Sequence, residues 1–215
     1  MARKPQRRTR ERILETALAL FNRDGEPSVT STAVAEEMGI SPGNLHYHFP
    51  AKEKIVEALF AAYRGEIEDT LAAPVMRPSD VEDVWLFLHL VFEAIWKYRF
   101  LYRDLTDLAA RYRTIERQIR IVLAHKQSTA AIILRGLVAA GRMTASSTDI
   151  EALAANMTLV ATYWLSFEAV RGPRGRAETS EVLARGAYQV MALAAPYLAP
   201  RERALLDHLA ERYRS

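Results

Sequence analysis

The segment from Thr30 to Phe49, TSTAVAEEMGISPGNLHYHF, restricts the fold of this chain more than any other stretch. Its first half carries apolar residues at helical spacing, namely Val34, Ala35 and Met38. Leu45 and Phe49, four residues apart, predict a second short helix with its own buried face. Between the two, Gly39 can close the first helix because glycine adopts positive φ easily. This pattern predicts a helix-turn-helix, the unit whose second helix enters the major groove of DNA.

The polar residues of the same segment fit this interpretation. Thr30 or Ser31 can supply the N-cap oxygen of the first helix, and either Ser41 or Pro42 can open the second. The residues of the second helix that lie off its buried face are Gly43, Asn44, Tyr47 and His48. The alternative is an ordinary helical hairpin inside a core. Composition, turn position and outward polar residues agree on the helix-turn-helix.

A helix and a basic segment precede this unit. Apolar residues recur at helical spacing from Thr9 to Arg23, and Gly25 can end that helix, which completes a three-helix domain. In the first twelve residues, Glu11 stands against the basic residues Arg3, Lys4, Arg7, Arg8, Arg10 and Arg12. Such an arm can attract phosphate or enter a minor groove, or it can be a disordered, solubilising terminus. Both interpretations stay open.

The sequence resembles the TetR family of bacterial transcriptional repressors. The resemblance is carried by Ile13 to Gly25 (ILETALALFNRDG), by the helix-turn-helix, and by SPGNLHYHFPAKEKI from Ser41 to Ile55. The remaining part of the chain, roughly three quarters, matches only as a helical domain of suitable length. The resemblance implies a homodimeric, ligand-responsive, DNA-binding transcriptional regulator that acts as a repressor.

The resemblance also implies which side chains contact double-stranded DNA. Ser41, Gly43 and Asn44 are expected at base edges, where the lack of a side chain at Gly43 lets the backbone come close. The residues expected at phosphates are Thr30, Ser31, Tyr47, His48 and Lys52. His46 is included as a further contact, although it departs from the family, in which tyrosine is usual.

The chain after Phe49 is expected to be helical throughout. A helix from Ala51 to about Ala72 is followed by helices near 80–99, 101–110, 112–140, 148–170, 177–198 and 201–213, with breaks at Gly141 and at RGPRGR (171–176). No stretch alternates long enough to propose a strand. The sequence therefore predicts an all-α protein with a DNA-binding domain at 1–53 and a larger helical ligand-binding and dimerisation domain at 54–215.

Composition restricts the function further. The 215 residues include no cysteine, so no disulfide and no thiolate metal site is expected. The five histidines form no metal pair at i, i+4, and neither a phosphate-binding glycine loop nor a nucleophile elbow occurs. We therefore expect no metal, no cofactor and no enzyme activity. Because no apolar run of membrane-spanning length and no secretory signal is found, we expect a cytoplasmic protein without a membrane partner.

The segment 80–99, DVEDVWLFLHLVFEAIWKYR, is apolar almost all round, which is typical of a helix buried on most sides. One stripe of it carries Trp85, Leu88, His89, Phe92 and Trp96. With Asn156 and Tyr163 from segment 148–170, this stripe predicts a pocket for a small hydrophobic or aromatic effector. Arg103 could pair with an acidic effector or neutralise a neighbouring aspartate. The alternative is that the stripe is plain core.

Segments 148–170 and 177–198 mix large and small apolar residues, which suits close helix packing. The resemblance implies that these two helices form a four-helix dimer contact. The candidate contact residues are Met157, Ala161, Trp164, Val190 and Met191. The alternative is that the two helices complete the core of a monomer. A two-fold dimer implies a palindromic operator.

Two other classes of function are retained as alternatives. One is a helical interaction module that uses the helix-turn-helix surface for a protein partner, which predicts no salt-sensitive binding to duplex DNA. The other is a small-molecule enzyme in the second domain, which predicts turnover of whatever compound binds there.

Overall fold

The structure is a computed structural model that describes residues 5–72, 80–171 and 180–211. It is helical, and within these ranges β structure is limited to one antiparallel bridge between Met143 and Leu198. The all-α fold class predicted from the sequence is confirmed. Contacts divide the chain into unit 1, which comprises Met1–Gly65 and Tyr98–Gln118, and unit 2, which comprises Glu66–Lys97 and Ile119–Ser215.

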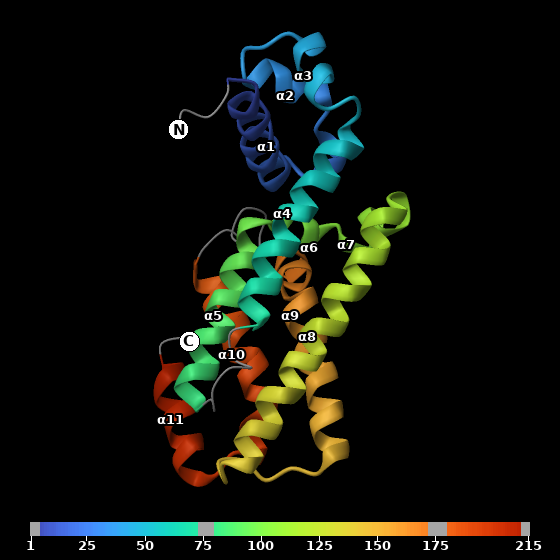
Figure 1. Ribbon diagram of the computed structural model, residues 1–215. Helices are drawn as coiled ribbons and strands as arrows, with labels where there is room; N and C mark the ends of the chain where they lie inside the picture. Colours follow the sequence, from blue (N-terminus) through green and yellow to red (C-terminus); the bar gives the residue numbers. More distant parts are fainter. Residues whose placement is uncertain (1–4, 73–79, 172–179, 212–215) are drawn as a thin grey trace. The chain divides into compact units, whose positions relative to one another are not determined.

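Unit 1 contains the helix-turn-helix (Figure 1). Its first elements are α1 (Pro5–Asp24), the 3-10 helix η1 (Glu26–Ser28), α2 (Ser31–Glu37) and α3 (Pro42–His48). The side chains buried among them include Ile13, Ala17, Phe21, Val34, Ala35, Leu45 and Phe49. Helices as short as α2 and α3 are not stable alone in water, so this shared core holds them in place.

Unit 1 also contains elements from later in the chain. These are the first part of α4 (Lys52–Ala72), α6 (Arg99–Arg103), α7 (Leu105–Arg111) and the start of α8 (Arg113–Ala139). Phe100 of α6 packs against Phe21 of α1, with ring centroids 5.3 Å apart. The buried Asn22 side chain accepts a hydrogen bond from the backbone N–H of Phe100 at 3.1 Å. Because of these contacts, unit 1 extends beyond the segment 1–53 that the sequence indicates as the DNA-binding domain.

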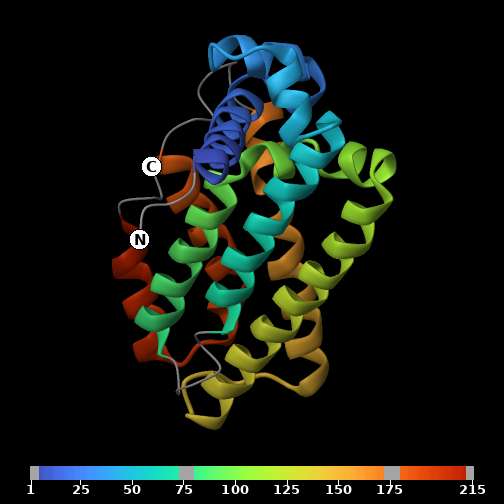
Figure 2. The ribbon, with the colours of Figure 1, turned by 45° about the horizontal axis from the view of Figure 1, so that its top comes forward.

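Unit 2 is a bundle of long helices (Figure 2). It comprises the last part of α4, α5 (Val81–Lys97), most of α8, α9 (Ser147–Arg171), α10 (Ser180–Ala194), η3 (Ala195–Tyr197) and α11 (Pro200–Ala210). Helix α10 packs against both α9 and α5. At Gly186 the approach is close enough that an added Cβ would lie 2.6 Å from ring atoms of Phe92 and Trp164. The indole N–H of Trp164 donates to the carbonyl of Val182 at 2.7 Å, which joins α9 to α10.

Some expected segments differ in the structure. The single helix expected over 101–110 is divided at Asp104 into α6 and α7. Helix α1 already begins at Pro5, so Arg8, Arg10 and Arg12 belong to a helix, while Arg3 and Lys4 of the basic arm lie outside the described residues. The basic RGPRGR stretch also lies outside them from Gly172 onward.

Helix α8 has a longer apolar run than the sequence interpretation expected. Over an 18-residue window its mean hydropathy is 1.2, so by length and composition alone it could cross a membrane. Core helices of globular proteins meet the same criterion, and this window contains the buried Lys126.

Candidate functional site

Helix α3 is held by one polar cap and an apolar inner face. The Oγ of Ser41 accepts a hydrogen bond from the backbone N–H of Asn44 at 3.2 Å, and Pro42 takes the first helical position. Leu45 and Phe49 cover the inner face, each with only 2% exposure. The start of the helix, which the sequence left open between two residues, is therefore capped by Ser41.

The outer face of α3 carries most of the residues expected to contact DNA. Ser41, Gly43, Asn44, His46 and Tyr47 are exposed, and His48 is half-buried. Tyr47 has 72% of its surface exposed. An added Cβ at Gly43 would meet nothing within 4 Å, so packing within the protein does not require glycine there. A residue without a side chain at this position would instead allow another molecule to approach the backbone closely.

The turn between α2 and α3 fixes how the second helix is presented. Gly39 has a φ of 65°, and the N–H of Ile40 donates to the carbonyl of Ala35 at 3.0 Å, which closes α2. At the other end of α2, the Oγ1 of Thr30 accepts from the N–H of Ala33 at 3.1 Å. This cap uses only a lone pair of the Thr30 oxygen, and the hydroxyl can still donate to a phosphate. Ser31, the other expected phosphate contact here, is half-buried.

A cation lies beside the end of α3. The guanidinium carbon of Arg10 is 4.7 Å from the ring centroid of Phe49, which is a cation–π distance. The exposed Arg10 side chain of α1 thus lies near the C-terminal end of α3. The rings of Tyr47 and His48 meet edge to face at 5.3 Å, which places the two expected phosphate contacts together.

Lys52, in the first turn of α4, has its ammonium group turned into the protein. Its Nζ donates to the carbonyls of Glu26 and Val29, each at 3.0 Å, and lies 3.0 Å from Oε1 of Glu26. An ammonium group has three N–H donors, so these contacts engage all of them. Lys52 therefore fastens α4 to the segment between α1 and α2. This positioning role is an alternative to the phosphate contact that the sequence predicts for Lys52.

Glu26 is the centre of a buried ionic cluster in unit 1. Its side chain is 0% exposed and accepts hydrogen bonds from Tyr112 at 3.0 Å and Arg111 at 2.5 Å, in addition to the contact with Lys52. Burial opposes ionisation of Glu26, but the bonds from Arg111, Lys52 and Tyr112 outweigh it and hold the pKa of the carboxyl below its ordinary value. The cluster joins η1 to α4 and to the junction of α7 and α8.

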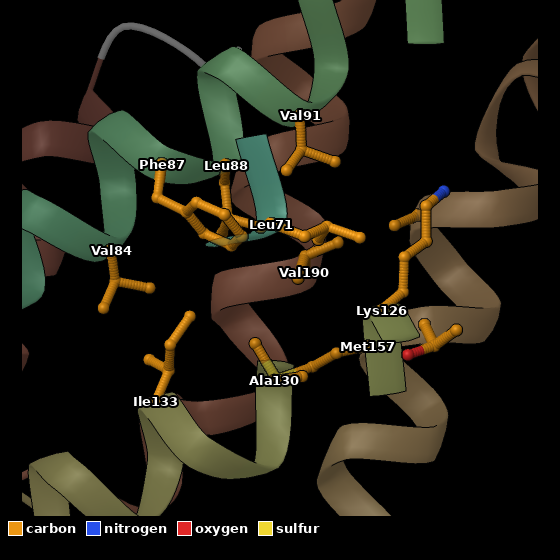
Figure 3. A pocket seen from close by; sticks show the side chains of 12 residues that line it. Leu71, Val84, Phe87, Leu88, Val91, Lys126, Ala130, Ile133, Met157 and Val190 are labelled. Atoms are coloured by element: carbon orange, nitrogen blue, oxygen red, sulfur yellow. The ribbon is translucent and has the colours of Figure 1, made fainter. Parts of the chain in front are cut away.

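Unit 2 contains an apolar pocket between α4, α5, α8, α9 and α10 (Figure 3). The lining residues are Leu71, Val84, Phe87, Leu88, Val91, Lys126, Ala130, Ile133, Met157, Thr158, Ala161 and Val190. The pocket holds about 470 Å³ of space not filled by atoms, part of it open to solvent. Lys126 is the one ionisable side chain in this lining, and burial lowers its pKa to about 7. Apolar walls with few polar groups are typical of small-molecule sites.

The aromatic stripe expected to bind an effector lies mainly outside the lining of this pocket. Phe92 is fully buried against Gly186, and Trp85, His89 and Trp96 are half-buried. The Nδ1–H of His89 donates to the carbonyl of Trp85, one turn earlier, at 2.8 Å. Helix α5 contributes a different set of residues to the lining: Val84, Phe87, Leu88 and Val91. A helix that is apolar all round gives no periodic signal for the face that meets a cavity.

The other three expected effector contacts are also separate from the pocket lining. Asn156 and Tyr163 are exposed on α9. Arg103 belongs to unit 1, where its guanidinium donates to the carbonyl of Asn22 at 2.9 Å. Their roles in effector binding stay predictions.

The residues expected at a dimer contact are covered within one protomer. Met157, Ala161, Trp164, Val190 and Met191 are all buried. Three of them, Met157, Ala161 and Val190, line the pocket. The exposed large apolar residues of α9 lie on another face: Leu159, Tyr163, Phe167 and Val170. Their spacing of four, four and three places them on one stripe of the helix.

Glu26 and Lys126 were not among the residues selected from the sequence. Glu26 could not be found by spacing, because its partners Arg111 and Tyr112 follow it by 85 and 86 residues. Lys126 had a readable signal, since a charged residue within an apolar helical run is unusual in a core.

Two family descriptions match consecutive parts of this chain. The family described as "Bacterial regulatory proteins, tetR family" matches residues 13–59, and the family described as "Bacterial transcriptional repressor" matches residues 62–206. A TetR-family transcriptional regulator from Marinobacter aquaeolei VT8 has a crystal structure with a TM-score of 0.86 and 33% sequence identity, covering 96% of this chain and 99% of that one.

More distant relatives match in part or in fold. The nucleoid occlusion factor SlmA of Haemophilus ducreyi is 29% identical over 127 residues, which are 56% of this chain and 61% of that protein. The chain matches between 26% and 61% of the length of the first curated relatives. A putative transcriptional regulator from Saccharomonospora viridis, solved in complex with choline, has a TM-score of 0.65 and 20% identity, covering 95% of this chain and 96% of that one.

Proposed function

This chain belongs to the TetR family of bacterial transcriptional regulators, and we propose on that basis that it is a homodimeric repressor released from a palindromic operator by a small hydrophobic effector. The observation that supports the DNA-binding part is the outer face of α3. There, exposed polar residues project from a helix that is capped by Ser41 and anchored by two buried side chains, Leu45 and Phe49.

In this proposal α3 enters the major groove of the operator. Ser41 and Asn44 reach base edges beside Gly43, which lets the backbone approach. Contacts to the phosphates come from Thr30, Ser31, Tyr47 and His48, with His46 as an additional contact. Lys52 acts by positioning α4, because its three donors are engaged within the protein.

The proposed dimer uses helix α9, on the stripe that is exposed in one protomer. Leu159, Tyr163, Phe167 and Val170 have 57%, 40%, 54% and 89% of their surfaces exposed. A stripe of large apolar residues open to water is a candidate association surface, and a two-fold dimer would pair the stripe with itself. The two reading helices would then meet half-sites about 34–36 Å apart, or a multiple of that distance.

The proposed effector site is the apolar pocket of unit 2. Helix α4 contributes residues both to this pocket and to the ionic cluster around Glu26 in unit 1. Leu71 of α4 lines the pocket, while Lys52 of the same helix binds Glu26. Helix α8 carries Lys126 in the lining and begins directly after Tyr112, another Glu26 partner. An effector that fits one arrangement of these helices better than another would shift the operator affinity by that difference.

The proposal includes no catalytic step and places the protein in the cytoplasm, where it meets chromosomal DNA. Its experimental test is selection of genomic fragments by the purified protein, followed by binding of the enriched fragments at several salt concentrations. A palindromic consensus and a steep salt dependence would support it. Binding without sequence enrichment, or turnover of a compound in the pocket, would contradict it. A protein partner on α3 together with salt-independent behaviour would favour the interaction module.

A further inference from the structure

The side chains proposed to contact phosphate carry no permanent positive charge. Thr30, Ser31 and Tyr47 are neutral, and a histidine such as His48 is charged only when it is protonated. The ammonium group of Lys52 is engaged by a carboxylate and two backbone carbonyls of the protein. Neutralisation of phosphates by Lys and Arg supplies a large share of the affinity of proteins for duplex DNA. A further cation beside α3 would therefore strengthen binding.

Two other cations of unit 1 are engaged with carboxylates. The ammonium of Lys54 lies 2.7 Å from the carboxylate of Glu57, and the guanidinium of Arg23 lies 2.9 Å from that of Asp24. A neighbouring negative charge opposes the attraction of such a side chain for phosphate. These ion pairs make both residues poor candidates for a contact with DNA.

Arg10 of α1 instead holds its charge against an aromatic ring at the C-terminal end of α3. Its guanidinium carbon lies 4.7 Å from the ring centroid of Phe49, the C-cap residue of α3. A cation–π contact attracts the charge without an N–H···O bond, so guanidinium donors can still reach an anion. Because Phe49 is buried and Arg10 is exposed, the ring can hold the guanidinium in place while it stays accessible.

The two residues before Phe49 are among those proposed to contact phosphate. Tyr47 has 72% of its surface exposed, and its ring meets that of His48 edge to face at 5.3 Å. Arg10 adds a permanent positive charge, from a different helix, to the end of α3 that carries these two side chains.

We infer that Arg10 binds a phosphate of the operator backbone, and that Phe49 holds its guanidinium at the C-terminal end of α3 for this contact. This inference rests on the proposed function, because it adds a contact to the same DNA-binding surface. A guanidinium suits the role, since its planar fork can donate two parallel hydrogen bonds to one phosphate. It selects one arginine of the basic N-terminal segment as a DNA contact.

Arg8 and Arg12 are matched controls on the same helix. Both are exposed, and each lies two residues from Arg10, which places it about 160° away around the helix axis. Arg10 precedes the buried Ile13 by three residues and so shares the side of α1 that packs inside unit 1. Arg8 and Arg12 therefore carry the same charge on the other side of α1.

The test measures binding of the full-length protein at several salt concentrations to two duplexes. One is a duplex that the protein selects from a random-sequence library, and the other is a scrambled version of it. Arg10→Gln should lower the slope of log affinity against log salt by about 0.9 in magnitude, which corresponds to about eightfold weaker binding near 0.1 M salt. The loss should be equal on both duplexes, because a phosphate contact carries no sequence information.

The remaining variants separate a site from charge in general. Arg10→Lys should keep the slope, since it keeps the charge. Arg8→Gln and Arg12→Gln should bind both duplexes as the wild type does. Arg10→Ala, which favours the helix, is the second variant in case glutamine alters folding. Thermal melting without DNA measures any structural role of Arg10.

Four outcomes would overturn the inference. An unchanged slope in Arg10→Gln and Arg10→Ala, with or without earlier melting, would show that Arg10 serves to cover Phe49. An equal loss of slope in the Arg8 and Arg12 variants would show diffuse attraction. A loss confined to the selected duplex would indicate base reading, as by a side chain in the minor groove. Failure of the wild type to select any duplex would contradict the proposed function as well, whereas the first three outcomes leave it intact.

Discussion

The ammonium of Lys52 lies 3.0 Å from the carboxylate of Glu26, whose side chain has no exposed surface. Lys52 begins α4, and Glu26 begins the short η1 segment between α1 and α2. Arg111 and Tyr112, at the junction of α7 and α8, donate further hydrogen bonds to the same carboxylate. One buried acid thus ties three parts of unit 1 together, so its charge state and its partners should affect both stability and DNA binding.

Replacement of Glu26 by Gln should destabilise the protein by about 2 kcal/mol near pH 7, because Lys52 and Arg111 lose their anionic partner. The folded-state pKa of Glu26 lies below its ordinary value of 4.5, so its stabilisation is present above that pH and is lost as pH falls. The difference between wild type and Glu26→Gln should therefore shrink on acidification. Chemical denaturation at neutral and at acidic pH measures it.

Glu57→Gln is the matched control for this experiment. Glu57 pairs with Lys54 at 2.7 Å on the surface of α4, where solvent screens a single pair and it contributes little to stability. A loss of stability in Glu26→Gln that is no larger than in this control, or that persists unchanged in acid, would show that the buried cluster contributes little.

Replacement of Lys52 by Ala separates a positioning role from a phosphate contact. We expect operator affinity to fall while the dependence of affinity on salt keeps its slope, because the ammonium already has three partners within the protein. A phosphate contact would instead lower the slope by about one unit. Fluorescence anisotropy on an operator duplex at several salt concentrations distinguishes the two, and a reduced slope would return Lys52 to the phosphate contacts.

The family and the helical fold could be predicted from the sequence because their signals are local. The cap at Ser41, the positive φ at Gly39 and the buried pair of Leu45 and Phe49 each depend on residues within a few positions. Local rules of capping and spacing therefore suffice for the helix-turn-helix, including its outward face.

The interior of unit 2 could not be read in the same way. Helix α5 is apolar over most of its surface, so periodicity does not distinguish Val84 and Val91, which line the pocket, from Phe92, which packs against Gly186. In α9 the buried Trp164 and the exposed Tyr163 are adjacent, and both are large aromatic residues. Which of them faces a partner depends on where α10 packs, and that is a tertiary property.

Replacement of Asn44 by Ala tests base reading by α3. If Asn44 makes a paired contact with a base, the variant should lose about 1–3 kcal/mol on the operator and tolerate change at one base step. Its N–H remains available to the Ser41 cap, so the fold should be intact. Competition binding with single-base operator variants measures the change. An equal loss on random duplexes would show that Asn44 does not read sequence.

Replacement of Gly43 by Ala separates the needs of DNA from those of the fold. The added methyl group meets nothing within 4 Å in the protein, and alanine favours a helix over glycine by up to about 1 kcal/mol. We therefore expect equal or greater thermal stability together with weaker operator binding, since the methyl would hold α3 away from the bases. Unchanged binding would show that no close approach occurs at Gly43.

Replacement of Gly186 by Ala should destabilise unit 2, because the new methyl would lie 2.6 Å from Phe92 and Trp164. Overpacking of this kind costs about 1–3 kcal/mol, from which the better helix propensity of alanine subtracts about 1 kcal/mol. Gly136→Ala in α8 is the control with the opposite sign, since its methyl meets nothing within 4 Å. Denaturation curves of the two variants should move in opposite directions, and a parallel shift would contradict the close approach of α10.

The dimer is tested by placing a charge on the exposed stripe of α9. Leu159→Glu should leave the protomer folded, because 57% of Leu159 is exposed, but it should bury an unpaired carboxylate in the proposed contact. Light scattering should show a monomer, and operator affinity should fall because one reading helix contacts only a half-site. Trp164→Glu should instead unfold unit 2, since Trp164 is buried and its indole N–H donates to the carbonyl of Val182.

Leu86→Glu on α5 is the matched control for Leu159→Glu, because 58% of Leu86 is exposed, and this variant should stay dimeric. A dimer that survives Leu159→Glu and dissociates in Leu86→Glu would show that the contact lies on α5.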